Sequence, residues 1–144
     1  SRSIKKKYLT LVKGRMQPQE GTIEAAIGRD TRDRKRMAVV GGGRGREAKT
    51  KYRVIEYVGD HSVLEIIPET GRTHQIRVHL AAIGYPVIGD AVYGVQSPYL
   101  KRQFLHAAQL GFCLPSSGEY VEFRSELPED LRNALKFVGG CGAK

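Results

Sequence analysis

The chain has 144 residues, enough for one domain with a hydrophobic core. Its 24 Lys and Arg outnumber its 15 Asp and Glu, which gives a formal net charge of +9. No stretch approaches the roughly 20 apolar residues of a membrane span, and Cys113 and Cys141 fit neither a metal-ligand spacing nor a disulfide framework. These observations argue against a membrane-spanning helix or a disulfide scaffold within these residues, and we expect a cytoplasmic protein.

The positive charge is concentrated in the first third of the chain. Residues 1–53 hold 16 Lys and Arg against 5 Asp and Glu, whereas residues 54–144 hold 8 against 10. Such asymmetry is typical of proteins that bind polyanions. A solvated basic tail is the alternative, but apolar residues at 8–12 and 37–40 interrupt the charges and favour a structured basic face.

The first half of the chain predicts strands separated by a long polar excursion. Residues 8–12 (YLTLV) are typical of a strand. Residues 13–49 are basic and rich in turn residues, with short strands expected at 21–27 and 37–40. Long excursions of this kind are usually functional or disordered.

The second half begins with a hairpin and a helix. Residues 51–58 and 62–67 alternate in polarity around Gly59-Asp60, which predicts an antiparallel hairpin. A helix is expected at about 72–83, and residues 87–94 (VIGDAVYG) form a turn-rich loop.

The remaining residues add a strand and a second helix. Residues 104–112 have an apolar pattern that includes His106, and residues 119–124 alternate like a strand. Pro128 opens a last helix, and residues 139–144 are expected to form a loose tail. The predicted class is α+β, with a mainly antiparallel mixed sheet and flanking helices.

The helix at 72–83 has recognisable ends. A hydroxyl of Thr70 or Thr73 is expected to cap its start, and Gly84 and Pro86 mark its end. The apolar positions at helical spacing are Ile76, Leu80 and Ile83.

Cationic and polar side chains crowd the first half of this helix, namely Arg72, His74, Gln75 and Arg77. A helix N-terminus carries partial positive charge, so two arginines there are locally unfavourable. We therefore expect an anion opposite them, either a phosphate or a buried carboxylate. An ordinary amphipathic helix with a solvated basic end is the alternative.

Several familiar motifs do not fit. The glycines of residues 43–48 (GRGREA) match a dinucleotide pattern, but no strand precedes them. No Walker Lys-Ser/Thr and no nucleophile elbow occur. His74 and His79 are five residues apart, which places them on different helix faces, so we expect no metal site.

Several segments together resemble the RluA/RluD-type pseudouridine synthases. The helix at 72–83 is followed by residues 87–94 and by residues 103–107 (QFLHA) in the order typical of that family. Further similar segments are residues 7–14, 21–29, 34–39, 48–52, 118–119, 123 and 127–128. The resemblance covers roughly residues 4–138.

The resemblance implies the pseudouridine synthase fold and an RNA substrate, ribosomal or transfer RNA. Such enzymes break the N-glycosidic bond of a uridine, turn the uracil and rejoin it through carbon, with no metal or cofactor. Their catalytic aspartate lies in a His-Arg-Leu-Asp motif, which the 144 residues do not contain. We therefore expect residues 1–138 to be the C-terminal portion of a catalytic domain, inactive alone, followed by the tail at 139–144.

The resemblance also implies residue roles. Arg77 matches the arginine that pairs with the catalytic aspartate, Tyr8 the tyrosine that stacks on the uracil, and Ile76 an apolar residue beside the base. The residues implied in RNA phosphate contact are Arg29, Arg34, Lys35, Arg36, Arg72, His74 and Gln75.

Simpler interpretations remain open. Tyr8 fits a core aromatic position, and Arg77 without the family aspartate is either solvated or paired with Glu69 or Asp90. Because the family aspartate is absent, we expect Arg77 to lack its partner, so its replacement by alanine should barely destabilise the chain. A cost of several kcal/mol would mean that Arg77 is paired within the chain, against the role that the resemblance implies. Asp90 lies in a Gly-Asp turn, where aspartate is usually structural. The aspartates that could substitute as nucleophile are Asp30, Asp33 and Asp90.

Two other functions compete with the synthase. One is a stand-alone RNA-binding module that keeps the fold without catalysis, which the basic first third supports equally. The other is a ribosome-associated structural protein, which leaves the clustering of active-site-like residues at 69–86 unexplained.

Overall fold

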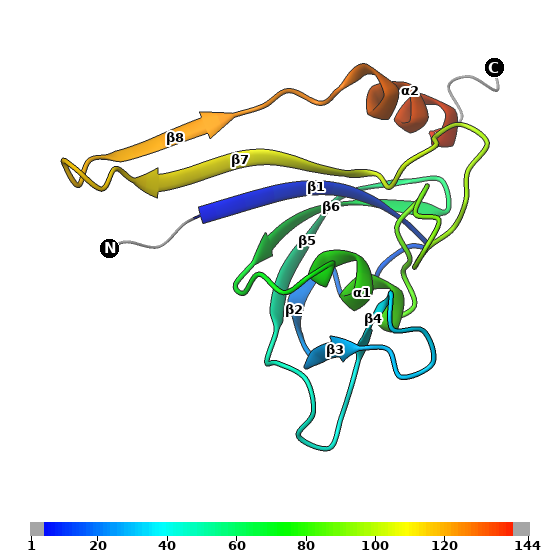
Figure 1. The fold of residues 1–144 in the computed structure, drawn as a ribbon. Coiled ribbons are helices and arrows are strands. Elements are labelled where there is room, and N and C mark those ends of the chain that lie inside the picture. Colours follow the sequence, from blue (N-terminus) through cyan, green and yellow to red (C-terminus); the bar gives the residue numbers. More distant parts are fainter. Residues whose placement is uncertain (1–4, 140–144) are drawn as a thin grey trace.

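A computed structural model describes residues 5–139 and contains eight strands and two helices in that range (Figure 1). The strands are β1 (Lys5–Lys13), β2 (Glu20–Glu24), β3 (Ile27–Arg29), β4 (Met37–Val39), β5 (Lys49–Val58), β6 (His61–Pro68), β7 (Leu105–Cys113) and β8 (Tyr120–Arg124). The helices are α1 (Gln75–Ala82) and α2 (Glu129–Val138). No helix among these residues is long and apolar enough to cross a membrane.

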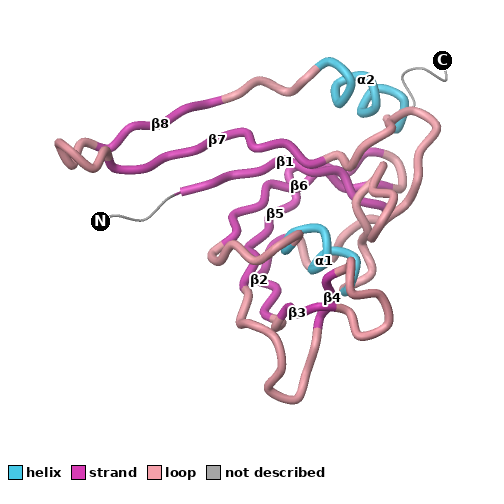
Figure 2. Tube along the Cα trace, in the orientation of Figure 1, coloured by secondary structure: helices cyan, strands magenta, loops and turns pink. Residues whose placement is uncertain are grey.

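Six strands form one antiparallel sheet in the order β2-β5-β6-β1-β7-β8. β3 and β4 form a separate hairpin below it, and the strands dominate the trace in Figure 2. Strand β1 lies between β6 and β7, so the N-terminal strand is paired on both sides. The predicted α+β class with a mainly antiparallel sheet is confirmed.

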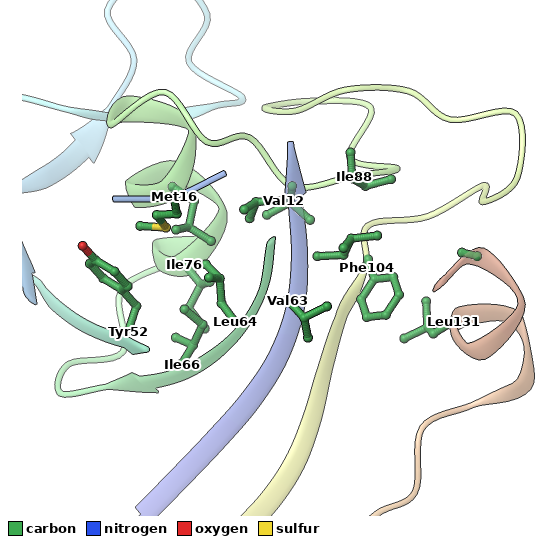
Figure 3. Packing of buried hydrophobic residues seen from close by; sticks show 14 of the residues in the cluster. Val12, Met16, Tyr52, Val63, Leu64, Ile66, Ile76, Ile88, Phe104 and Leu131 are labelled. Atoms are coloured by element: carbon green, nitrogen blue, oxygen red, sulfur yellow. The ribbon is translucent and has the colours of Figure 1, made fainter. Parts of the chain in front are cut away.

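The two faces of the sheet pack against different helices. Cross-strand register places Tyr8 of β1 and Tyr52 of β5 on the same face as Ile66 of β6. Figure 3 shows Ile76 of α1 beside Ile66 on this face, while Leu131 of α2 lies on the other side of β1. The alternation of side chains along each strand therefore presents Tyr8 to the helix that carries Arg77.

The end of α1 is as predicted, and its start is not. Gly84 has a φ of +91°, and the amides of Gly84 and Tyr85 donate to the carbonyls of Ala81 and Leu80, which is a Schellman ending. The expected threonine cap is wrong, because the helix begins at Gln75 after His74, with no side-chain cap. The hydroxyl of Thr70 instead donates to the Gln75 side chain.

Most other predicted elements are confirmed with small shifts in their ends. The hairpin at 51–67 is β5 and β6, and the segment at 119–124 is β8. Residues 104–112, for which the apolar pattern predicted no particular element, form β7. Residues 87–94 form a loop without a helix or strand. The predicted tail lies outside the described residues beyond Gly139.

Buried hydrogen bonds tie α1 to β5 and to the chain that follows β2. The Gln75 amide donates to the hydroxyl of Thr50 at 2.9 Å, and that hydroxyl lies 2.7 Å from Nδ1 of His79. Because Thr50 accepts from Gln75, its own proton is directed to His79, whose Nε2 then donates to the carbonyl of Ala25 at 2.9 Å. His79 is fully buried, and this arrangement requires a neutral imidazole.

Replacing His79 with glutamine should reduce the loss of stability in acid. Burial lowers the pKa of His79, although its bond to Ala25 opposes that shift. The stability that depends on the neutral ring is therefore complete above the unfolded pKa of about 6.5 and is lost as the pH falls. Urea unfolding from about pH 7.5 to about pH 5 measures this, and His79→Gln should have the shallower slope.

Some slope should remain in that variant, because burial also lowers the pKa of His61 and His74. Equal slopes for His79→Gln and the unchanged chain would show that His79 does not titrate with unfolding.

Candidate active site

A pocket of about 430 Å³ lies where β1, the turn after β6 and the start of α1 meet. Six residues to which the sequence analysis gave a role in catalysis or in substrate or RNA binding line it, namely Tyr8, Arg72, His74, Gln75, Ile76 and Arg77. Lys6, Glu69 and Leu105 complete much of the remaining wall. The structure thus brings together residues from β1 and α1 that are about 70 positions apart in sequence.

Arg77 and Asp90 form a bidentate ion pair beside this pocket. Nε of Arg77 donates to Oδ2 of Asp90 at 2.7 Å, and Nη2 donates to Oδ1 at 3.0 Å. The Asp90 side chain is fully buried and that of Arg77 is 13% exposed. Fork-to-fork geometry of this kind fixes a guanidinium in orientation as well as position.

The loop at 87–94 is shaped to hold this carboxylate. Oδ1 of Asp90 also accepts from the backbone amides of Val92 and Tyr93 at 3.0 and 3.1 Å. Any side chain at Gly94 would collide with the carbonyl of Val87, so the close turn requires glycine there. Burial opposes ionisation of Asp90, but the bonds from Arg77 and the two amides outweigh it and lower its pKa.

Asp90 is therefore the anion expected opposite the basic helix start. Of the three states left open for Arg77, the structure shows pairing with Asp90 and not solvation or pairing with Glu69. The expectation that Arg77→Ala barely destabilises the chain is accordingly wrong, because it assumed an arginine without a partner. The bond to Asp90 raises the pKa of Arg77, so the guanidinium stays charged.

Tyr8 lies half-buried in β1 on the pocket side of the sheet. The pairing of β1 with β7 shifts register between Lys7 and Tyr8, which marks a β-bulge beside the pocket. Bulges re-aim side chains and are frequent next to active sites. The residue opposite Tyr8 on β7 is Ala107, and the Tyr8 ring packs against the edge of the main core.

His74 has a left-handed backbone, with a φ of +56°. Left-handed non-glycine residues are uncommon and often mark functional sites. Its ring is held by Tyr93, whose hydroxyl lies 2.8 Å from Nδ1. Burial and the charge of Arg77 lower the pKa of His74.

Gln75 differs from its predicted role. Its side chain is 4% exposed, and its oxygen accepts from Thr70 and from the amide of Arg72. Its nitrogen donates to the carbonyl of Lys49 and to Thr50. Because no hydrogen-bonding position remains free, we leave Gln75 out of the RNA-contacting set and regard it as structural.

The remaining predicted basic residues lie on the β3–β4 hairpin and beside the pocket. Arg29 is the last residue of β3 and Arg36 immediately precedes β4, with Arg34 and Lys35 exposed at the turn between them. Arg36 lies over the Tyr93 ring, 5.1 Å from its centroid. Arg72 is anchored at the pocket by Nε, which donates to the carbonyl of Glu47.

Tyr93 is the residue that the sequence prediction missed. The only signal was its place in the Gly-Asp-x-x-Tyr-Gly pattern of residues 89–94, which was interpreted as a loop. The described residues contain no group of three or more His, Cys, Asp or Glu that could hold a metal. His74 and His79 contact different partners, as their spacing predicted.

Known proteins with similar sequences are RNA-modifying enzymes by name. A family model described as RNA pseudouridylate synthase matches residues 1–82. The chain is 54% identical over 138 residues to an uncharacterized RNA pseudouridine synthase of Chloroflexus aurantiacus, covering 94% of this chain and 43% of that protein. It is 41% identical over 145 residues to ribosomal large subunit pseudouridine synthase D of Zymomonas mobilis, covering 94% and 45%.

A solved structure agrees with these matches. That of human RNA pseudouridylate synthase domain containing 1 superposes with a TM-score of 0.75 and 36% identity, covering 87% of this chain and 55% of that one. The chain thus spans less than half the length of the two curated relatives above.

Arg77→Ala should cost about 3–5 kcal/mol of unfolding free energy, because it leaves the buried Asp90 carboxylate without its partner. Urea unfolding of Arg77→Ala, Asp90→Ala and the double variant gives the coupling energy between the two side chains. The matched control is Arg102→Ala, which breaks the similarly bidentate but exposed pair with Asp130 and should cost far less. Equal costs for the two arginines would contradict the buried pair.

Proposed function

This chain belongs to the RNA pseudouridylate synthase family, and we propose that it supplies the base-binding and arginine half of an active site that isomerises uridine in RNA. The reaction breaks the N1–C1′ bond and forms a C5–C1′ bond, while C5 loses a proton and N1 gains one. Substrate and product therefore have the same atoms. The proposed substrate is ribosomal RNA, in line with the name of the Zymomonas mobilis relative, and the proposed compartment is the cytoplasm.

One observation carries this proposal: Tyr8, Ile76 and the paired Arg77 line a single pocket. A base extruded from an RNA stack needs another flat surface, and stacking on an aromatic ring is worth about 1–3 kcal/mol. Tyr8 offers that ring and Ile76 an apolar contact. The volume of about 430 Å³ suits a single base with its ribose.

Arg77 is the residue that we propose to hold the catalytic aspartate. A guanidinium has five N–H donors, and Asp90 occupies one on Nε and one on Nη2. Among the described residues, no acceptor bonds Nη1. Asp90 balances the charge of the guanidinium and fixes its orientation. A second carboxylate that enters the pocket could accept from Nη1, and this hydrogen bond would orient it and favour its ionised form.

The aspartate itself is proposed to come from a His-Arg-Leu-Asp segment outside these 144 residues. The aspartates within the chain fit this role poorly. Asp90 already bonds Arg77 and two amides, and the carboxylates of Asp30 and Asp33 accept from backbone amides in the turn of the β3–β4 hairpin.

A stand-alone RNA-binding module is the second candidate function. The basic hairpin residues Arg29, Arg34, Lys35 and Arg36 would contact phosphates in either case, because phosphate contacts position RNA without requiring catalysis. Only a catalytic assay separates the two functions.

A chimera tests the synthase proposal. The N-terminal part of the Zymomonas mobilis enzyme would be joined to this chain in place of the enzyme's own matching residues. Tritium release from ribosomal RNA labelled at uracil C5 is expected from the chimera but not from this chain alone. Release should be lost in the Arg77→Ala chimera.

The whole Zymomonas mobilis enzyme is the control for substrate quality. If that enzyme releases tritium and a folded chimera does not, the proposed function is wrong. Release by this chain alone would place the nucleophile within the 144 residues and would contradict the role given to the missing segment.

RNA affinity should depend steeply on salt if the hairpin binds phosphates. For single-stranded RNA, each neutralised phosphate contributes about 0.7 to the slope of log affinity against log salt. Changing Arg34 and Lys35 to glutamine should therefore reduce that slope by about 1.4, as measured by fluorescence anisotropy with labelled oligouridylate. The matched control, Arg124→Gln with Lys136→Gln, removes the same charge from β8 and α2 and should leave the slope unchanged.

A further inference from the structure

One side chain contacts both the basic hairpin and the pocket. The hydroxyl of Tyr93 accepts a hydrogen bond from the amide of Met37, the first residue of β4, at 2.9 Å. The same hydroxyl lies 2.8 Å from Nδ1 of His74, the residue just before α1. The backbone amide of Tyr93 also donates to Asp90.

The direction of these bonds follows from counting protons. The phenol oxygen has one proton, and the Met37 amide uses one of its acceptor positions. We assign the remaining Tyr93 proton to Nδ1 of a neutral His74, the one acceptor that lies within hydrogen-bond distance of it among the described residues; burial and the charge of Arg77 lower the pKa of that imidazole. The bond fixes the ring and leaves the proton of His74 on Nε2.

The Tyr93 ring also joins two arginines of the proposed site. The guanidinium carbons of Arg36 on the hairpin and of Arg77 in the pocket each lie 5.1 Å from its centroid. Nε of Arg36 is buried and has no hydrogen-bond partner among the described residues, and the Tyr93 ring offers this guanidinium a cation–π contact.

The β3–β4 hairpin and α1 pack against each other beside the Tyr93 ring. A small apolar cluster contains Val78 of α1 with Ile27 of β3 and Ala48, and Met37 and Tyr93 pack against it. This cluster is separate from the main core. The β3–β4 hairpin is not part of the six-stranded sheet. Backbone bonds between Ile27 and Arg46 hold one strand of it, and the contacts of Tyr93 with Met37 hold the other.

We propose that Tyr93 is a positioning residue that couples the RNA-contacting hairpin to the pocket, through Met37 on one side and through His74 and Arg77 on the other. A phosphate bound at the hairpin turn then favours the pocket geometry that receives the base, and a bound base favours the hairpin position. This inference rests on the proposed function, since it assigns the hairpin to RNA phosphates and the pocket to uracil.

Tyr93→Phe tests the coupling because it keeps the ring and both arginine contacts but removes the two hydroxyl bonds. Binding of labelled oligouridylate by the 144-residue chain should weaken about three- to tenfold. In ¹⁵N spectra of the free chain, His74 should change from a single Nε2–H tautomer to a mixture of both.

The matched control is Tyr57→Phe. The hydroxyl of Tyr57 also makes two hydrogen bonds, with Met16 and Gln17, and its ring also lies under an arginine. Unlike His74 and Arg77, the partners of Tyr93, none of these residues lines the pocket. This variant should leave both RNA affinity and the His74 spectrum unchanged, so a loss of stability alone would not imitate the expected result.

Combining Tyr93→Phe with the two hairpin substitutions separates coupling between hairpin and pocket from a local effect on the pocket. Changing Arg34 and Lys35 to glutamine should weaken binding by a smaller factor in Tyr93→Phe than in the unchanged chain, because the hairpin no longer acts on the pocket. Equal factors, or a Tyr93→Phe chain with unchanged affinity and tautomer, would overturn the proposal. If the unchanged chain binds no RNA, the proposed function fails, while the His74 spectrum still decides whether Tyr93 holds the imidazole.

Discussion

The geometry of the proposed site depends on the ion pair between Arg77 and Asp90. A charged guanidinium that is 13% exposed needs a partner, and a fully buried carboxylate needs one even more. In the loop at 87–94, two backbone amides donate to the carboxylate, and the tight turn at Gly94 allows this geometry. The ion pair therefore fixes the loop and α1 relative to each other. Arg77 is thereby placed at the pocket wall before any substrate or further carboxylate arrives, which reduces the ordering cost of binding.

Hydrogen bonds on the opposite side of α1 complete this support. Gln75 and His79 connect the helix to Thr50 on β5 and to Ala25, and both side chains are buried. Satisfied polar networks of this kind give rigidity, whereas an unpaired member would be costly. The strained backbone of His74 is tolerated where the Gln75 network and the Tyr93 hydroxyl meet. The pocket thus has a rigid wall of helix and sheet. The neighbouring hairpin is attached through backbone hydrogen bonds of Ile27 with Arg46, through Tyr93 and through a small apolar cluster.

Local patterns in the sequence predicted the sheet and the end of α1. The alternation of apolar and polar residues and the glycine at position 84 are signals that depend only on residues close by in the sequence. They also grouped Tyr8, Ile76 and Arg77 through family resemblance. They failed where the deciding partner was distant in sequence. Gln75 is an example, because two of its partners lie 25 and 26 residues earlier. The cap of α1 failed for a local reason, because Thr70 bonds the Gln75 side chain five residues later and not the backbone at the helix start. Only the three-dimensional arrangement of the loop at 87–94 shows which partner Arg77 has and which residues Tyr93 contacts.

The most direct test is to measure how firmly Arg77 is held in the free chain. In ¹⁵N NMR spectra, a bidentate pair should slow rotation of the guanidinium, give a protected Nε–H and resolve the two Nη groups of Arg77. Asp90→Asn should abolish that restriction while the sheet signals remain. This outcome would confirm that Asp90 fixes the arginine within this chain. A freely rotating guanidinium in the unchanged chain would contradict the account, because the pocket would then lack its fixed positive wall.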